Sequence, residues 1–228
     1  MTRQESVAEP IGLRERNKSK RRNAIVEATL DLARTRSLAE VSIELIAAEA
    51  EVAPATVYNL IGSRDHLIHA CIDRVVDQLV DALVLIDPAT DPLAAAVAIV
   101  EQSSEAFIAD GHAYRQIIAT IGNAGSGSML AIDPAQLQIA AMRAAQLQGI
   151  LRTDIDPVAL GRQIALSYNG SLLAWARHLL TDDGLRLATI HGLWTALAAA
   201  ASDEHRSDFL EKFRLVGRQL AQAGWGDD

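Results

Sequence analysis

Apolar residues recur at helical spacing along almost the whole chain, and this periodicity constrains the fold more than any other feature. Between residues 19 and 35, the apolar side chains of Ile25, Ala28, Leu32 and Ala33 fall on one face of a helix. No stretch shows the sustained apolar and polar alternation, rich in β-branched and aromatic residues, that is typical of strands. Half of the 228 residues are apolar, which is enough to bury a sizeable core. The sequence therefore predicts an all-α protein.

Two short helices are predicted between residues 42 and 60. The first follows Ser42, a residue type that commonly caps helix N-termini. The second begins at Pro54, because a proline in the first helical turn removes an N–H that would be unpaired anyway, and it is expected to end near Leu60, ahead of Gly62. Two such helices joined by a tight turn form a helix-turn-helix, whose second helix can place side chains in the major groove of DNA.

A long helix and six further helices are predicted in the rest of the chain. Ser63 is a suitable N-cap for the long helix, which is expected to end before Asp87 and Pro88. Loops rich in Gly, Pro and Asp separate the later helices, at residues 87–92, 111, 122–128, 133–134, 149–157 and 181–184. The last three helices are expected over about 156–180, 185–201 and 205–223.

Basic residues gather near the N-terminus of an otherwise acidic chain. The net charge is −8, yet residues 1–22 hold seven Lys and Arg side chains against three acidic ones. Taken by itself, such a cluster fits a solvated tail as well as it fits an electrostatic contact to an acidic partner. The charge cluster alone does not distinguish a solvated tail from an electrostatic contact, so the sequence that follows it is needed to choose between them.

Residues 42–67 strengthen the helix-turn-helix interpretation. They read SIELIAAEAEVAPATVYNLIGSRDHL, which resembles the signature of the TetR family of ligand-responsive transcriptional regulators, roughly T-x-x-x-I-A-x-x-A-G-V-S-x-x-T-x-Y-x-Y-F-x-S-K-E-x-L. With the first helix, the resemblance covers residues 20–70. It implies a basic N-terminal arm over residues 1–22, an N-terminal helix-turn-helix DNA-binding domain over 19–66, and a C-terminal helical ligand-binding and dimerisation domain over 67–228.

Several positions depart from the family signature. Glu51 stands where the family usually has glycine in a turn that favours positive φ, at a cost on the order of 1 kcal/mol. Ala53 replaces the usual Ser or Thr N-cap, which loses about 1 kcal/mol of helix stabilisation. Leu60 and Ile61 replace an aromatic pair, so one phosphate contact is in doubt. These departures fit an alternative hypothesis, a helical small-molecule-binding module with weakened or lost DNA binding.

The resemblance implies which side chains contact double-stranded operator DNA. Thr56 and Tyr58 are expected on the exposed side of the second short helix, opposite Val57. Arg64 is expected to meet a phosphate at the N-terminus of the long helix. The complete predicted set is Arg21, Arg22, Ser42, Ala55, Thr56, Tyr58, Asn59 and Arg64.

The resemblance also implies a homodimer and a small-molecule effector. The helices over 156–180 and 185–201 are apolar on more than one face, which favours a four-helix bundle with a second copy. The interface candidates are Leu172, Trp175, Leu179, Leu193, Trp194 and Leu197. The pocket candidates, which fit core positions equally well, are Phe107, Tyr114, Met142, Tyr168 and Asn169. The apolar helices around them suggest a hydrophobic or amphipathic effector such as a lipid-like, steroid-like or acyl-CoA molecule.

No catalytic residue, metal site or cofactor is predicted. The six histidines form no metal-binding motif, and the glycine-rich segment 122–127 lacks the preceding strand and the GK[ST] of a phosphate loop. An all-α enzyme remains the rival hypothesis, although no Ser/His/Asp arrangement stands out. Cys71 has no partner for an internal disulfide, and no apolar stretch reaches the roughly 18 residues that span a bilayer. We therefore expect a cytoplasmic protein that makes no membrane contact.

Overall fold

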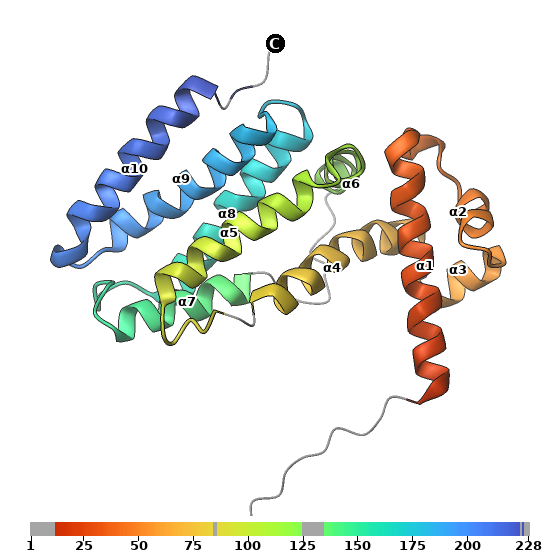
Figure 1. Ribbon diagram of the computed structural model, residues 1–228, viewed down its shortest axis with the longest axis horizontal. Coiled ribbons are helices and arrows are strands. Elements are labelled where there is room, and N and C mark those ends of the chain that lie inside the picture. The colour runs from red at the N-terminus through yellow and green to blue at the C-terminus, as the bar shows by residue number, and fades with distance from the viewer. Residues whose placement is uncertain (1–11, 84–85, 125–134, 224, 226–228) are drawn as a thin grey trace, which may run out of the picture. The chain divides into compact units, whose positions relative to one another are not determined.

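The chain is all-α, as its periodicity predicts. The computed structural model describes residues 12–83, 86–124, 135–223 and 225. Within these residues the chain forms ten α-helices and one short 3-10 helix (Figure 1). It divides into two compact units after Leu67.

The first unit is a small three-helix domain built on one long helix. Its elements are α1 (Leu13–Thr35), the 3-10 helix η1 (Leu38–Glu40), α2 (Ile43–Glu49) and α3 (Pro54–Leu60). The stripe predicted on α1 is buried, and Ile25 and Ala33 at its two ends are fully inaccessible. Ile46 of α2 and Val57 of α3 complete this core. The two short helices lie against α1 and form a helix-turn-helix (Figure 1).

α1 begins earlier than the sequence predicts. The expected start near Ser19 is wrong, because the helix extends back to Leu13, with Gly12 at its N-cap position. Residues 13–22 contain neither proline nor glycine and are rich in Arg, Lys and Glu, which are good helix formers. The described part of the basic arm is therefore helical.

The second unit contains the remaining helices. α4 (Arg64–Leu83) begins in the first unit and continues in the second. The six later helices, the predicted number, are α5 (Pro92–Ile108), α6 (Gly111–Ala124), α7 (Ala135–Leu147), α8 (Pro157–Ala176), α9 (Asp182–Ala200) and α10 (Asp203–Ala223). Residues 122–124 of the predicted glycine-rich loop belong to the end of α6, and residues 125–128 lie outside the described part of the chain.

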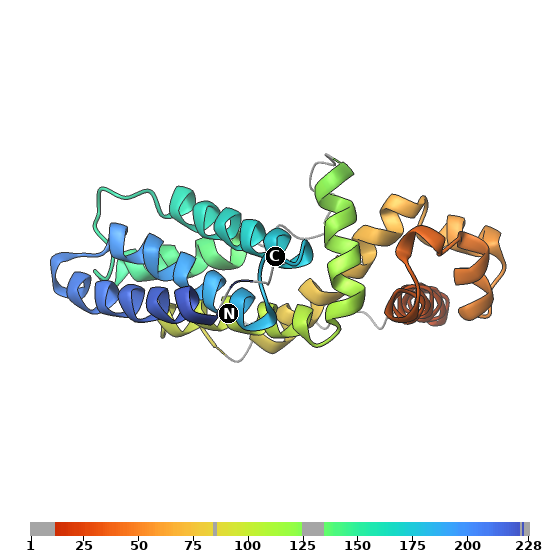
Figure 2. The same cartoon turned by 90° about the horizontal axis from the view of Figure 1, so that it is seen from above.

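Close packing of α7, α8, α9 and α10 forms the main core. α9 packs against α5, α8 and α10, and α7 packs against α5 and α8 (Figure 2). Met142, Ile164, Leu193 and Phe209 are buried where these helices meet. α7 and α8 approach so closely at Gly161 that a Cβ atom there would lie 2.8 Å from the backbone of Ile139. None of the described helices is both long and apolar enough to cross a membrane.

Candidate DNA-binding surface and ligand cavity

Local hydrogen bonds and backbone geometry define the helix-turn-helix. The Ser42 hydroxyl accepts a hydrogen bond from the Leu45 N–H at 3.2 Å, which confirms it as the cap of α2. In the turn, Glu51 adopts a positive φ of 53°, the conformation expected from the family's glycine. Ala53 provides no side-chain cap for α3. The motif is therefore formed even though two of its positions carry residues that stabilise it poorly.

α3 divides its side chains between the core and solvent. Val57 is fully buried, whereas the neighbouring Tyr58 is 55% exposed. Ala55 and Asn59 are exposed as well, and Thr56 is half-buried. The outward face of α3 thus presents a phenol, an amide and a hydroxyl, groups that can hydrogen-bond to base edges and phosphates. Side chains that contact DNA must be exposed. The contacts of these side chains with DNA stay a prediction.

The start of α1 carries a group of exposed cations. None of its side chains before Ile25 is buried. The exposed basic residues are Arg14, Arg16, Lys18, Lys20 and Arg21, and Arg22 is half-buried. Because these cations lie on a helix, they are held at fixed spacing along its surface and can attract a polyanion such as DNA.

The Arg64 guanidinium makes contacts that the sequence did not indicate. It donates hydrogen bonds to the backbone carbonyls of Leu38 and Val41, which ties the first residue of α4 to the segment between α1 and α2. The two carbonyls lie 26 and 23 residues earlier in the chain, so no local pattern could have revealed them. The guanidinium has further N–H groups, and its predicted phosphate contact remains a prediction.

A cavity of about 310 Å³ lies in the second unit. α4, α5, α7 and α8 surround it, and its described lining is mainly apolar, with Ile72, Val76, Phe107, Leu166 and Leu172 among the lining residues. A cavity of this size with an apolar lining and a few polar groups is typical of small-molecule sites.

Three of the five predicted pocket residues line this cavity. Phe107, Tyr168 and Asn169 do so, and their contact with a ligand stays a prediction. Tyr114 instead packs edge-to-face on the Phe107 ring, with the centroids 5.2 Å apart, and is not among the lining residues. Met142 is buried in the core formed with α9 and α10. Helical spacing alone could not separate these cases, because a cavity wall and a core are both apolar.

The polar groups of the cavity include two that the sequence did not single out, Ser103 and Gln138. The Ser103 hydroxyl donates to the Ile99 carbonyl at 2.6 Å, and the Gln138 Nε2 donates to the Ala96 carbonyl at 3.1 Å. The Gln138 Oε1 and the Tyr168 hydroxyl are buried and have no hydrogen-bond partner in the described part of the chain.

Burial also determines the protonation of Tyr168. It raises the pKa of this residue to about 12, although the hydroxyls of Ser103 and Ser104 lie near enough to oppose the shift. Neither serine meets the geometry of a hydrogen bond to the phenol. The hydroxyl is therefore protonated at neutral pH and can donate a hydrogen bond.

Most of the predicted dimer contacts belong to the core of a single chain. Five of the six candidates, all but Leu179, are at most 8% exposed: Leu172, Trp175, Leu193, Trp194 and Leu197. These five have little surface left to offer a second chain. The exposed side chains of α9 include the small residues Thr195 and Ala199.

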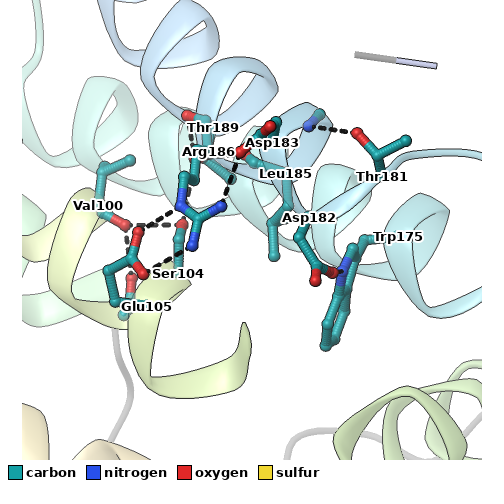
Figure 3. A network of polar contacts seen from close by, with 12 residues as sticks. Val100, Ser104, Glu105, Trp175, Thr181, Asp182, Asp183, Leu185, Arg186 and Thr189 are labelled. Carbon is teal, nitrogen blue, oxygen red and sulfur yellow. Dashed lines mark hydrogen bonds and ion pairs between the residues drawn. The ribbon is translucent and has the colours of Figure 1, made fainter. Parts of the chain in front are cut away.

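Polar contacts join α5 to α9 beside this core (Figure 3). Arg186 of α9 donates to both carboxylate oxygens of Glu105 on α5, at 2.5 and 2.9 Å. The Ser104 and Thr189 hydroxyls of the same two helices lie 3.2 Å apart, within hydrogen-bonding distance. The hydrogen bonds from Arg186 hold the pKa of Glu105 below its ordinary value.

A second group of contacts links α6 to the connection between α8 and α9. Asp182 accepts hydrogen bonds from the Trp175 indole N–H and from Arg115, both at 2.7 Å. Arg115 also donates to the Trp175 carbonyl, and its guanidinium lies 4.2 Å from the centroid of the Trp175 ring. Burial raises the pKa of Asp182, but these hydrogen bonds outweigh it and leave the pKa below its ordinary value.

The described residues contain no group of His, Cys, Asp and Glu side chains that could hold a metal ion. Cys71 is buried and forms no disulfide. Three features described above are candidates for function: the outward face of α3, the basic start of α1 and the cavity.

Comparison with known families identifies the first unit. The family model for bacterial regulatory proteins of the tetR family matches residues 25–71, which run from α1 through α3 into α4. The match covers the helix-turn-helix whose geometry is described above. Over these residues the chain matches the DNA-binding region of the tetR family. Among curated proteins, no sequence matches the chain.

Solved structures of TetR-family regulators share the fold over most of the chain. A TetR transcription regulator from Haloarcula marismortui superimposes with a TM-score of 0.63 at 16% identity, over 81% of this chain and all of the other. SmeT, the repressor of a Stenotrophomonas maltophilia multidrug efflux pump, gives 0.56 at 21% identity, over 80% and 91% of the two chains. Thermus thermophilus FadR, a repressor in complex with lauroyl-CoA, gives 0.52 at 20% identity, over 78% and 93%.

Proposed function

We propose that this chain is a TetR-family transcriptional regulator that binds operator DNA through α3 and is released from it by a small molecule. The observation that carries the proposal is the partition of α3, in which Val57 fills the core while Tyr58 and Asn59 face solvent. The cations at the start of α1 add sequence-independent attraction, because neutralised phosphates release their counterions. That SmeT and FadR are repressors supports the repressor role.

α4 gives the proposed regulation a physical basis. Its first residue, Arg64, is bonded to carbonyls of the first unit, and Ile72, Val75 and Val76 further along the same helix line the cavity. A molecule in the cavity therefore contacts the helix that is anchored to the DNA-binding unit. A ligand that prefers one position of α4 shifts the equilibrium by its difference in affinity, and a coupling of about 1–3 kcal/mol changes DNA affinity about 5- to 150-fold.

The same function requires two copies of the chain. Dimeric helix-turn-helix proteins meet two half-sites about 34 Å apart, one in each of two successive major grooves. We infer a homodimer in which the outward faces of α8 and α9 meet. The small exposed side chains of Thr195 and Ala199 on α9 allow a partner helix to approach closely.

Fluorescence anisotropy with the duplex upstream of the chain's own gene tests the proposal. Tyr58→Ala should weaken binding about 5- to 150-fold, since a single side-chain contact to DNA is worth about 1–3 kcal/mol, and should leave the thermal melt unchanged. Leu147→Ala is the control, because Leu147 is 89% exposed at the end of α7 in the other unit. Undiminished DNA affinity in Tyr58→Ala would contradict the proposed use of α3. If the wild type binds no DNA, the alternative of a helical small-molecule-binding module is favoured.

A further inference from the structure

The charge of the cavity wall restricts what the cavity can hold. Among the described residues that line it, Arg162 alone is charged, and its side chain is exposed. An anion placed among Ile72, Phe107 and Leu172 would therefore lose its hydration without gaining a buried cation, which is strongly unfavourable. The part of a ligand that enters the cavity should carry no charge.

Two buried polar atoms restrict the ligand further. Gln138 on α7 uses its Nε2 to donate to the Ala96 carbonyl, so its unpaired Oε1 can only accept a hydrogen bond. Tyr168 on α8 has an unpaired hydroxyl that can donate or accept. Each atom has given up hydrogen bonds to water on burial, so a ligand that restores them gains affinity. Oε1 requires a donor, which carboxylates, esters and thioesters do not have.

We propose that the cavity binds an uncharged, largely apolar alcohol or phenol, whose hydroxyl group pairs with the buried polar atoms of Gln138 and Tyr168. A hydroxyl is the smallest uncharged group that can donate to Oε1 and also accept from a phenol. The apolar remainder of the molecule fills the space between α4, α5, α7 and α8. This inference rests on the proposed function only in treating the cavity as the effector site.

Calorimetric titration of the full chain with matched ligand pairs tests the ligand class. Decanol is compared with decanoate and naphthol with naphthoate, so that each pair differs only in the polar group. At neutral pH the better alcohol should bind at least about tenfold more tightly than its carboxylate, because the carboxylate is buried without a partner. Lowering the pH should strengthen binding of the carboxylates, since the protonated acid is neutral and has a donor. Equal or tighter binding of the carboxylates at neutral pH, tighter binding of lauroyl-CoA, or no binding of either alcohol would overturn the proposal.

Two variants test the named contact. Tyr168→Phe removes only the buried hydroxyl and should weaken binding of the alcohol about fivefold, the effect of one net hydrogen bond. Thr29→Val is the matched control, because it removes a buried hydroxyl of α1 that donates to the Ile25 carbonyl and does not line the cavity. It should leave the affinity for the alcohol unchanged. An unchanged affinity in Tyr168→Phe would exclude Tyr168 from the site.

The outcome can be separated from that of the proposed function. Binding of the alcohol by a chain that binds no operator would support the ligand class and contradict the regulator. Operator binding by a chain that binds the carboxylates more tightly than the alcohols would support the regulator and contradict the ligand class. If both hold, the alcohol should lower operator affinity in the wild type and do so less in Tyr168→Phe at the same ligand concentration.

Discussion

Single glycines limit how closely the helices of the second unit can approach. At Gly161 an added Cβ would lie 2.8 Å from the backbone of Ile139, which cannot move without shifting α7. Gly161→Ala should therefore lower the free energy of unfolding by about 1–3 kcal/mol, as overpacking commonly does. Urea unfolding measures the loss. Gly192→Ala is the matched control, because its Cβ would meet the Ser167 Oγ, which can rotate away. An equal loss in both variants would contradict the role assigned to the α7 backbone.

The family resemblance determined the direction of some side chains and not of others. It placed Val57 inward and Tyr58 outward correctly, because the motif specifies which face of the short helix is buried. It placed Trp175 and Trp194 at an interface, although both are buried within one chain. On α8 and α9 more than one face is apolar, and only the tertiary packing shows which of them the chain itself covers.

The link between α6 and the start of α9 depends on an ionised carboxylate. Asp182 has a folded-state pKa below its ordinary value of 3.8, so its contribution to stability is present above that pH and is lost as the pH falls through the folded pKa. Asp182→Asn should lower the melting temperature at neutral pH, by less than about 1 kcal/mol of unfolding free energy because the side chain is half-exposed. The difference from the wild type should shrink below pH 3.8.

Thermal melts between neutral pH and about pH 3 check this expectation. Asp154→Asn is the control, since Asp154 is more exposed and accepts its hydrogen bond from Arg152, two residues away. It should lower the melting temperature at neutral pH by less than Asp182→Asn does. A constant difference between Asp182→Asn and the wild type across this pH range would show that the charge of Asp182 does not matter.

The basic start of α1 can be removed without disturbing the core. Its first buried residue is Ile25, so a chain that lacks residues 1–22 should keep its fold. It should bind DNA more weakly and with a flatter salt dependence, because the slope of log K against log salt falls by about 0.9 for each phosphate that is no longer neutralised. Anisotropy titrations at several salt concentrations measure the slope. Changing Arg14, Arg16, Lys18 and Lys20 to Gln keeps the helix and should give a similar flattening, whereas an unchanged slope would make the arm a passive tail.

The number and order of helices could be predicted for the described residues, and their packing could not. Residues such as Gly, Pro and Asp mark most of the connections after α4, although the connection Ala201–Ser202 between α9 and α10 contains none of them. Contacts between residues that are far apart in the sequence produce no local sequence pattern. The bonds from Arg64 to Leu38 and Val41 cross more than twenty residues, and the cavity collects side chains from four helices. The polar residue Gln138 was missed because a cavity wall has no periodicity of its own.

At the scale of the assembly, we predict a homodimer that forms through the outward faces of α8 and α9. The wild type should sediment at twice its 24.5 kDa. Thr195→Arg should sediment at 24.5 kDa, because a long charged side chain beside Ala199 on the exposed face of α9 would hold partner helices apart. It should also weaken operator binding, since one chain meets only one half-site.

The chain offers a closely matched control for this variant. Thr120 on α6 is exposed like Thr195, and each hydroxyl donates to the carbonyl four residues earlier, at 2.8 and 2.7 Å. Thr120→Arg adds the same charge and the same bulk away from α8 and α9, so it should remain dimeric. A wild type that sediments at 24.5 kDa at micromolar concentration would contradict the dimer itself. If Thr195→Arg stays dimeric while the wild type is a dimer, the subunits must meet through another face, because a closely packed interface does not accommodate an arginine in place of a threonine.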